Sequence, residues 1–396
     1  MTQFGKGMLE HWALDPEIIY LNHGTVGAPP RRVLAAQQAI RDEIERQPAR
    51  FLLREISTPT TGALSRRGRP RLREAADVVA AFLGARGDDL AFVDNATSGV
   101  NAVLRSLAFR PGDEILIPDL AYGAVALTAA FVARTHGATV RTVTMPHPIR
   151  KPEEVTAAIA AALNERTRVA IVDHVTSESA LIMPLAEIAA ACRARGVPVL
   201  VDGAHAPGAI AVDLESLGVD WYTGNLHKWA WSPRSCGVLW AAPERQSGLH
   251  PPVISWGLDQ GFLAEFDWVG TRDPSAALAA PEGLAFMREL GVDAVRAYDH
   301  ALAWQAARWL CERWGTRLET PESMIGTMAA LPLPARAGAT REDGVRLKDA
   351  LLYEDGIEAQ IHATHGRIEV RISAQVYNDM SDIERFAKAV EGRIPA

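Results

Sequence analysis

The chain has 396 residues, of which 48% are hydrophobic and 22% charged, and its formal net charge is −7. This composition is typical of a globular protein with a large core; it excludes the basic surface that nucleic acids require, and no apolar run approaches the ~18 residues of a membrane span. The three cysteines lie far apart without metal-ligand spacing, and the first residues lack the apolar core of a signal peptide, so we expect a cytoplasmic protein that holds no metal ion.

Residues 1–30 are interpreted as an N-terminal arm that ends in a glycine- and proline-rich loop. Within this loop, Asn22 and His23 either point into a site or form a capped turn. Apolar spacing predicts a helix from Arg31 to about Gln47. A polar stretch from Arg50 to Gly68 is interpreted as loop. A second helix is predicted from Pro70 to Leu83, with a proline at its start and a glycine after its end.

Short apolar segments then alternate with helical patterns up to Asp202. Near-continuous apolar strands separated by helices indicate an α/β fold, with a mostly parallel sheet covered by helices on both faces. Ligands of such sheets bind beyond the carboxyl ends of the strands. The predicted strands are 90–94, 114–118, 138–144, 168–173 and 197–202, followed by a strand-like segment at 219–224. The predicted helices are 98–107, 123–135, 153–163 and 184–194.

The pattern changes after Trp240, through a segment rich in Gly, Pro and Trp. We predict a large domain over residues 31–273 and a smaller α+β domain over residues 274–396. In the small domain, Ile368, Val370 and Ile372 alternate with charged residues, which is typical of a half-buried strand. The other predicted elements are helices at 275–290, 292–313, 341–353 and 380–390, a strand at 327–333 and a strand paired with that of Ile368.

Two residues point to a pyridoxal phosphate (PLP) site. Asp202 ends a buried apolar strand, and Lys228 follows in a segment rich in Trp and Gly. Such a lysine holds the PLP aldehyde as a Schiff base, and such an aspartate keeps the pyridine nitrogen protonated. Taken alone, Asp202 is equally a helix cap and Lys228 a solvated side chain, but their order and spacing together predict the cofactor site.

A helix N-terminus is predicted to bind the phosphate. The segment 95–101 joins a strand to a helix, and its amides and the Thr97 hydroxyl lie where anions bind. An ordinary capped helix is the alternative. Asn225, His227 and Thr271 are further candidate phosphate donors.

Two more side chains are candidates at the ligand edge. Tyr122 either stacks on the pyridine ring or packs in the core. Arg371, in the alternating strand, either binds a substrate carboxylate through two parallel donors or forms an exposed ion pair with Glu369 or another acid.

With these motifs, the chain resembles the class V aminotransferase family of fold type I PLP enzymes, and within it the isopenicillin N epimerase-like group. The resemblance covers nearly the whole chain. It is carried by Asn95-Ala-Thr-Ser-Gly-Val-Asn101, Asp202-Gly-Ala-His205, Gly224-Asn-Leu-His-Lys-Trp229 and Trp268-Val-Gly-Thr-Arg-Asp273.

The resemblance implies a homodimer whose active sites lie at the subunit interface and are shared. It implies four residues at the reacting centre: Lys228, Asp202, His205 and Tyr122. Arg371 is implied to hold the substrate carboxylate, with Asn22 and His23 as further substrate candidates from their own loop. The implied cofactor contacts are Ala96, Thr97, Tyr122, Ser177, Asp202, His205, Asn225, His227 and Lys228, together with Thr271 from the neighbouring subunit.

The expected reaction begins with loss of the Cα proton of an amino acid or small peptide-like substrate. Epimerisation is the leading interpretation; a carbon–sulfur or other β-elimination, or transamination, is the alternative. A PLP-binding regulator or an inactive homologue is disfavoured, because Lys228 and Asp202 are intact and no DNA-binding segment is fused to the chain. Desulfurases of the family use a loop cysteine, but the corresponding stretch 361–366 has none. Its histidines, His362 and His365, are interpreted as solvent-exposed.

Overall fold

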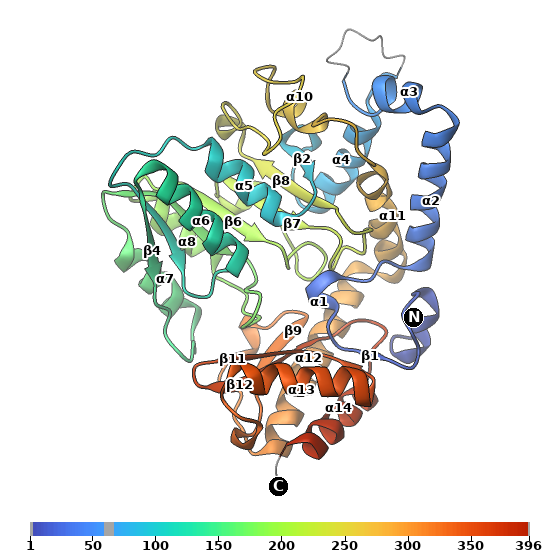
Figure 1. The fold of residues 1–396 in the computed structure, drawn as a ribbon, viewed down its shortest axis with the longest axis vertical. Coiled ribbons are helices and arrows are strands. Elements are labelled where there is room, and N and C mark those ends of the chain that lie inside the picture. The colour runs from blue at the N-terminus through green and yellow to red at the C-terminus, as the bar shows by residue number, and fades with distance from the viewer. Residues whose placement is uncertain (1–2, 59–66, 395–396) are drawn as a thin grey trace.

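The computed structural model describes residues 3–58 and 67–394, which form a large unit and a smaller one below it that holds the C-terminal elements (Figure 1). Residues 59–66 of the predicted polar loop lie outside the described residues. The part of that loop before them is helical: α3 (Pro48–Arg50) continues into a π-helical turn (Phe51–Glu55). Phe51 anchors the turn, because its side chain is only 2% exposed. The Arg71 guanidinium lies over the Phe51 ring, 4.4 Å from the ring centroid.

The large unit is built on a seven-stranded sheet of order β2-β8-β7-β6-β5-β3-β4. The predicted mostly parallel sheet is confirmed. One strand was missed: β8 runs antiparallel to both of its neighbours, since the segment after β7 returns directly beside it. The strands are β2 (Leu90–Val93), β3 (Glu114–Pro118), β4 (Thr139–Val143), β5 (Thr167–Asp173), β6 (Val199–Gly203), β7 (Trp221–Asn225) and β8 (Gly237–Ala241).

Helices cover both faces of this sheet. Alternate residues of each buried strand enter two separate apolar cores, as the period of two in a strand requires. One face carries α5 (Ala96–Ser106), α6 (Gly123–His136) and α10 (Phe262–Asp267). The other carries α4 (Arg71–Phe82), α7 (Pro152–Ala162), α8 (Leu185–Arg193) and α11 (Ser275–Leu290). The short helix α9 (Leu214–Leu217) and two 3-10 turns (Gly87–Asp89, Pro243–Arg245) lie in the connections.

The small unit packs helices on a three-stranded antiparallel sheet of order β11-β12-β9. It also holds part of the N-terminal arm, because β1 (Ile19–Tyr20) pairs in parallel with β10 (Ile357–Glu358). The remaining elements are β9 (Met328–Pro332), β11 (Gln360–Thr364), β12 (Arg367–Ser373), α12 (Val292–Trp314), α13 (Arg341–Asp355), α14 (Met380–Arg393) and 3-10 turns at Glu322–Met324 and Ala335–Ala337.

The packing of α11 bears on the predicted boundary between residues 273 and 274. Ala276, Ala280 and Leu284 of α11 belong to the core that covers the large sheet, where α11 contacts α2 (Arg31–Arg46) and α4. The small core receives instead the later part of α12. Packing therefore groups α11 with the large unit, although α11 begins after the predicted boundary between residues 273 and 274.

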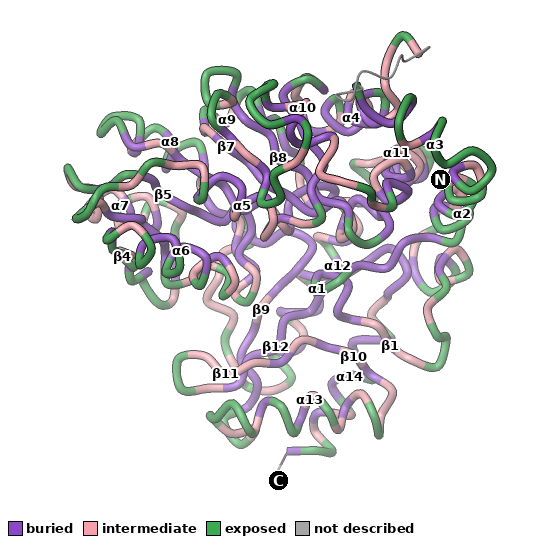
Figure 2. The backbone as a smooth tube through the Cα atoms, turned by 45° about the horizontal axis from the view of Figure 1, so that its top comes forward, coloured by how far each residue is buried: buried purple, intermediate pink, exposed green. Residues whose placement is uncertain are grey.

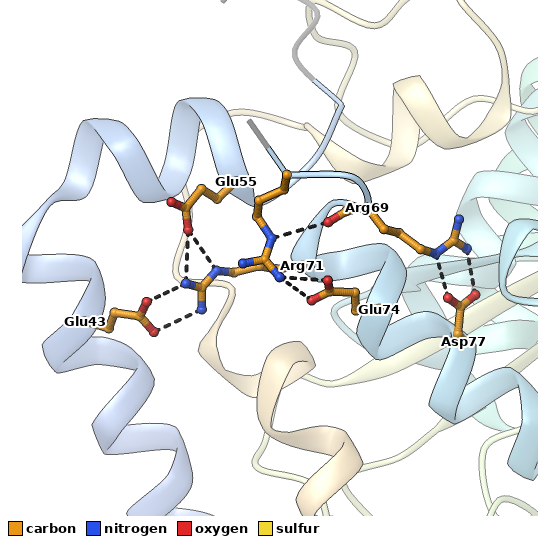
Figure 3. Close-up of polar contacts among 7 residues, drawn as sticks. Glu43, Glu55, Arg69, Arg71, Glu74 and Asp77 are labelled. Atoms are coloured by element: carbon orange, nitrogen blue, oxygen red, sulfur yellow. Dashed lines mark hydrogen bonds and ion pairs between the residues drawn. The ribbon is translucent and has the colours of Figure 1, made fainter. Parts of the chain in front are cut away.

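An ion-pair cluster ties α2, the π-helical turn and α4 together (Figure 3). Arg71 at the start of α4 bridges Glu43 of α2 and Glu55 of the turn, and Arg69 binds Asp77 one turn further along α4 with a nitrogen–oxygen distance of 2.6 Å. Burial alone raises the pKa of Glu55, but hydrogen bonds from Arg50 and Arg71 outweigh burial and lower it. The charged form of Glu55 is thus the one that the fold stabilises.

Buried backbone runs through the centre of both units, and exposed segments lie at the periphery (Figure 2). The arm helices η1 (Lys6–His11) and α1 (His23–Val26) complete the described elements. Within residues 3–58 and 67–394, no helix is both long and apolar enough to cross a membrane.

Candidate active site

A cavity of about 210 Å³ lies at the carboxyl edge of the large sheet. Its wall is formed where β2, β5, β6 and β7 end, because the carboxyl ends of parallel strands meet at one edge. The cavity is lined by Thr25, Asn95, Ala96, Thr97, Tyr122, Asp173, Ser177, Asp202, Ala204, His205, Asn225, His227 and Lys228.

Lys228 lies in the turn that follows β7, at the bottom of this cavity. Its Nζ is 3.1 Å from Nε2 of His205. Burial, and next the charge of Arg371, lower the pKa of Lys228 to about 7. A substantial share of the amine is therefore uncharged near neutral pH, the form in which it acts as a nucleophile or a base.

Asp202 ends β6 as a buried carboxylate. Its Oδ1 accepts the Ala204 N–H at 3.0 Å, so the predicted capping alternative describes one of its two oxygens. Burial raises the pKa of Asp202, with Lys228 lowering it in part. Such a carboxylate, buried without an ion-pair partner at hydrogen-bond distance in the described chain, is stabilised when a cationic ligand binds against it.

Asp173 is a cavity residue that the sequence reasoning missed. It ends β5 and lies opposite Asp202 in the register of β5 and β6. Burial, and next the charge of Asp202, raise the pKa of Asp173 well above its usual range. The signal was present in the sequence, since both acids follow an apolar strand, but Asp173 was read only as the end of its strand.

The N-terminus of α5 forms the end of the cavity where an anion is favoured. Asn95 caps the helix, with Oδ1 accepting the Ser98 N–H at 2.9 Å. The Ala96 N–H donates to Oδ1 of Asn225 at 2.8 Å, which fixes the first turn against the end of β7. Thus the capped helix and the anion site, posed as alternatives from the sequence, occur in the same turn.

The two imidazole side chains of the cavity, His205 and His227, have lowered pKa values. Burial, followed by the charge of Lys228, lowers the pKa of His205 well below its usual range. Burial lowers the pKa of His227 to about 4, and its Nδ1 lies 2.8 Å from the Cys236 carbonyl oxygen. Tyr122 precedes α6 and is 46% exposed at the cavity edge, so it does not pack in the core.

Arg371, from the small unit, contacts two residues of the cavity wall, Ser177 and Thr25. It is 2% exposed, and it donates from Nη1 to the Ser177 carbonyl at 2.6 Å and from Nη2 to Thr25 Oγ1 at 2.8 Å and Asn22 Oδ1 at 3.2 Å. The alternative ion pair with Glu369 is not formed, because Glu369 binds Arg367 at 2.7 Å. Among the described residues Nε of Arg371 has no hydrogen-bond partner, so donors remain for a substrate anion.

Four predicted site residues do not line the cavity: Asn22, His23, Thr271 and Arg371. His23 is fully buried behind Lys228: its Nε2 donates to the Lys228 carbonyl at 3.0 Å, and its Nδ1 is 2.8 Å from the Tyr377 hydroxyl. Both ring nitrogens are thus engaged, and His23 holds the lysine backbone. Thr271 is exposed and does not line the cavity of its own chain. Asn22 contacts the site through Arg371.

The residues present fit PLP. An aldehyde requires an uncharged amine, which Lys228 supplies, and a protonated pyridine nitrogen requires a buried carboxylate, which Asp202 supplies. The phosphate requires a helix N-terminus, which α5 supplies. Nδ1 of His205 is buried without a hydrogen-bond partner in the described chain, as expected for a group that faces a ligand.

Comparison with known proteins gives one family model, aminotransferase class V, which matches residues 60–386. The isopenicillin N epimerase of Streptomyces clavuligerus is 35% identical, over 96% of this chain and 95% of that protein. A probable chloroplastic L-cysteine desulfhydrase of Arabidopsis thaliana is 33% identical, over 96% and 84%. A variant of the cystine C–S lyase C-DES, solved with glycine covalently linked to its PLP cofactor, superposes with a TM-score of 0.76 at 19% identity, over 96% of this chain and 97% of that one.

Proposed function

Because the chain belongs to the class V aminotransferase family and is a PLP-dependent enzyme, we propose that it epimerises an amino acid or small peptide-like substrate at Cα. The observation that carries this proposal is the buried amine of Lys228, whose pKa is lowered to about 7 and which lines one cavity with Asp202. Arg371, whose Nε has no hydrogen-bond partner among the described residues, contacts the wall of the same cavity. The relative named isopenicillin N epimerase supports the outcome at Cα.

The cavity lining supports a set of residues that would hold PLP. Lys228 would bind its aldehyde and Asp202 its ring nitrogen, with Tyr122, His205 and Ser177 next to the ring. Ala96, Thr97, Asn225 and His227 would bind its phosphate. When bound, PLP supplies an acceptor for the electron pair left at Cα.

The protein residues then move one proton. Arg371 fixes the substrate carboxylate through parallel donors, which orients the Cα–H bond. Nζ of Lys228 takes the Cα proton, and its lowered pKa suits it to this transfer near neutral pH. Epimerisation then requires a proton to reach Cα on the opposite face, from a donor other than Nζ. His205, at 3.1 Å and uncharged, orients Nζ without competing for the charge.

Carbon–sulfur β-elimination is the second candidate function. The desulfhydrase relatives favour it, and it needs the same first proton transfer to Lys228. The outcomes differ in whether the substrate carries a leaving group at Cβ. A cysteine-persulfide route is not proposed, since Cys192, Cys236 and Cys311 are buried and none of them lines the cavity.

A substrate panel tests the proposal. The purified holoenzyme is incubated with amino acids in deuterated water, and Cα deuterium, loss of chirality, pyruvate, sulfide and keto acid are measured. Cα exchange with loss of chirality supports epimerisation. Pyruvate with sulfide moves the assignment to β-elimination, and keto acid moves it to transamination. No Cα exchange with any amino acid would overturn the proposal.

Arg371→Lys is expected to weaken amino-acid binding by about 1.5–3 kcal/mol, the range for a hydrogen bond to a charged group. Lysine keeps the charge but loses the forked donors, and it cannot hold Ser177, Asn22 and Thr25 together. Substrate titration of the cofactor absorbance measures this, and the absorbance without substrate should not change. Unchanged affinity with a lower melting temperature would make Arg371 a purely structural residue.

We also expect a homodimer with shared sites, in which Thr271 completes the partner's phosphate site. The segment near it exposes apolar side chains, with Ile254 54% and Trp256 70% exposed, which is typical of a surface covered by a partner. Light scattering should give twice the chain mass of 42.8 kDa. An active monomer would contradict this prediction.

A further inference from the structure

A second cavity of about 310 Å³ adjoins the active site and is not used by the residues assigned above. The two cavities share Tyr122 and Ser177, so they lie next to each other at these residues. One wall comes from the loop 145–149 of the large unit, and the other from the β11–β12 hairpin of the small unit. The space therefore begins beside the reacting centre and extends away from it.

The β11–β12 hairpin places His362, which lines this cavity, near Arg371, which is proposed to bind the substrate carboxylate. His362 of β11 lies opposite Glu369 of β12, and Arg371 is two residues further along β12. Side chains two residues apart in a strand share a face, and cross-strand partners share it too. His362 and Arg371 are thus diagonal neighbours on one face of the sheet. A substrate whose carboxylate binds Arg371 can reach His362 with its side chain.

His362 is a largely buried polar side chain that has no hydrogen-bond partner among the described residues. Its side chain is 10% exposed, in contrast to the predicted solvent exposure, because the hairpin packs it into the cavity wall. Neither of its ring nitrogens has a hydrogen-bond partner in the described chain. Glu369 is 3.9 Å away and is already held by Arg367. Burial lowers the pKa of His362, so the ring is neutral and offers one donor and one acceptor.

We propose that this second cavity holds the substrate side chain and that His362 is a specificity residue. The preferred substrates are then α-amino acids whose side chain extends several atoms beyond Cβ and carries a hydrogen-bonding group, such as S-substituted cysteines or 2-aminoadipate, rather than free cysteine. This inference rests on the proposed function, because it needs the Cα of the substrate to lie at Lys228.

Part of the cavity wall is a contact between the two units. The rings of His147 and His365 stack with centroids 3.6 Å apart and an interplanar angle of 9°. Both residues line the cavity. A buried polar group that no protein atom satisfies is stabilised when a ligand supplies the missing hydrogen bond.

The test compares Cα–H exchange of L-alanine with that of S-carboxymethyl-L-cysteine and L-2-aminoadipate, using the holoenzyme. Wild-type kcat/KM should be at least about tenfold higher for the two long substrates. In His362→Phe, kcat/KM for the long substrates should fall about tenfold, mainly through KM, because the side chain binds equally in the ground and transition states. The value for L-alanine should stay within about twofold, and His362→Gln should recover most of the loss.

Two further variants serve as controls. Thr320 lines the cavity from a segment outside the hairpin, so Thr320→Trp should narrow the cavity. This variant should lower kcat/KM for the long substrates and leave the value for L-alanine unchanged. His11 is a 43% exposed histidine outside both cavities. His11→Phe should therefore leave kcat/KM unchanged for L-alanine and for the long substrates. Equal rates for short and long substrates in the wild type, or an equal loss for both in His362→Phe, would overturn the inference while leaving the proposed function intact. Absence of exchange with L-alanine and the long substrates alike would instead count against the proposed function itself.

Discussion

Lys228→Ala is expected to lower turnover by roughly 100- to 10,000-fold, the range for removal of a general base. The loss has two sources, because Nζ both binds the cofactor covalently and takes the Cα proton. Cofactor affinity should fall less than turnover, since Asp202, the N-terminus of α5 and the ring contacts remain. Turnover and cofactor absorbance measure the two effects separately.

The matched control for this variant is Lys388→Ala, at an exposed lysine of α14. Its turnover should equal that of the wild type. Borohydride reduction of the wild-type holoenzyme, followed by peptide mass spectrometry, should place the reduced cofactor on Lys228, and added methylamine should restore part of the activity of the alanine variant. Reduced cofactor on a different lysine would refute the assignment.

Asp202→Ala should cost turnover about 100- to 1,000-fold, while cofactor binding falls far less. The carboxylate holds the ring nitrogen in its protonated state, and the electron pair at Cα loses its acceptor without it. The neighbouring Asp173 is not expected to replace it, because burial, the largest cause of the raised pKa of Asp173, remains in this variant. Steady-state rates measure the loss of turnover, and cofactor titration of the same preparation measures the loss of cofactor binding.

Asp173→Asn is the informative comparison for Asp202. It keeps the shape of a buried carboxyl group whose pKa is raised well above its usual range, so it should be much milder than Asp202→Ala. If Asp202→Ala turned over at near-normal rates, the Asp202 carboxylate would serve only to accept the Ala204 N–H.

Local patterns predicted the parts of the site that lie at strand ends. Asn95, Asp202 and Asn225 each follow an apolar strand, and parallel topology places such residues at one edge whatever their separation in sequence. The antiparallel β8 was missed because a short buried apolar segment shows no periodicity that separates it from the loop after it. The resemblance to a family, not periodicity, supplied the roles of the cavity residues.

Partners far apart in sequence could not be predicted. Nothing in the loop around Asn22 shows that it binds the guanidinium of Arg371, or that His23 holds the carbonyl of Lys228. The interpretation of His362 as solvent-exposed failed for the same reason, since its burial depends on the large unit lying against the hairpin. Side-chain burial at such contacts follows from the assembled chain and not from local pattern.

The parallel pairing of β1 with β10 has a consequence for how the protein is made. A ribosome synthesises the arm first, yet Thr25 binds Arg371 across 346 residues, and Ile19 pairs with Ile357. Until the last strands emerge, the arm has none of these partners, and closing so long a loop carries an entropic cost that only the finished contacts offset. A nascent chain can therefore build its large sheet early, but it acquires a complete substrate site only when synthesis is almost over.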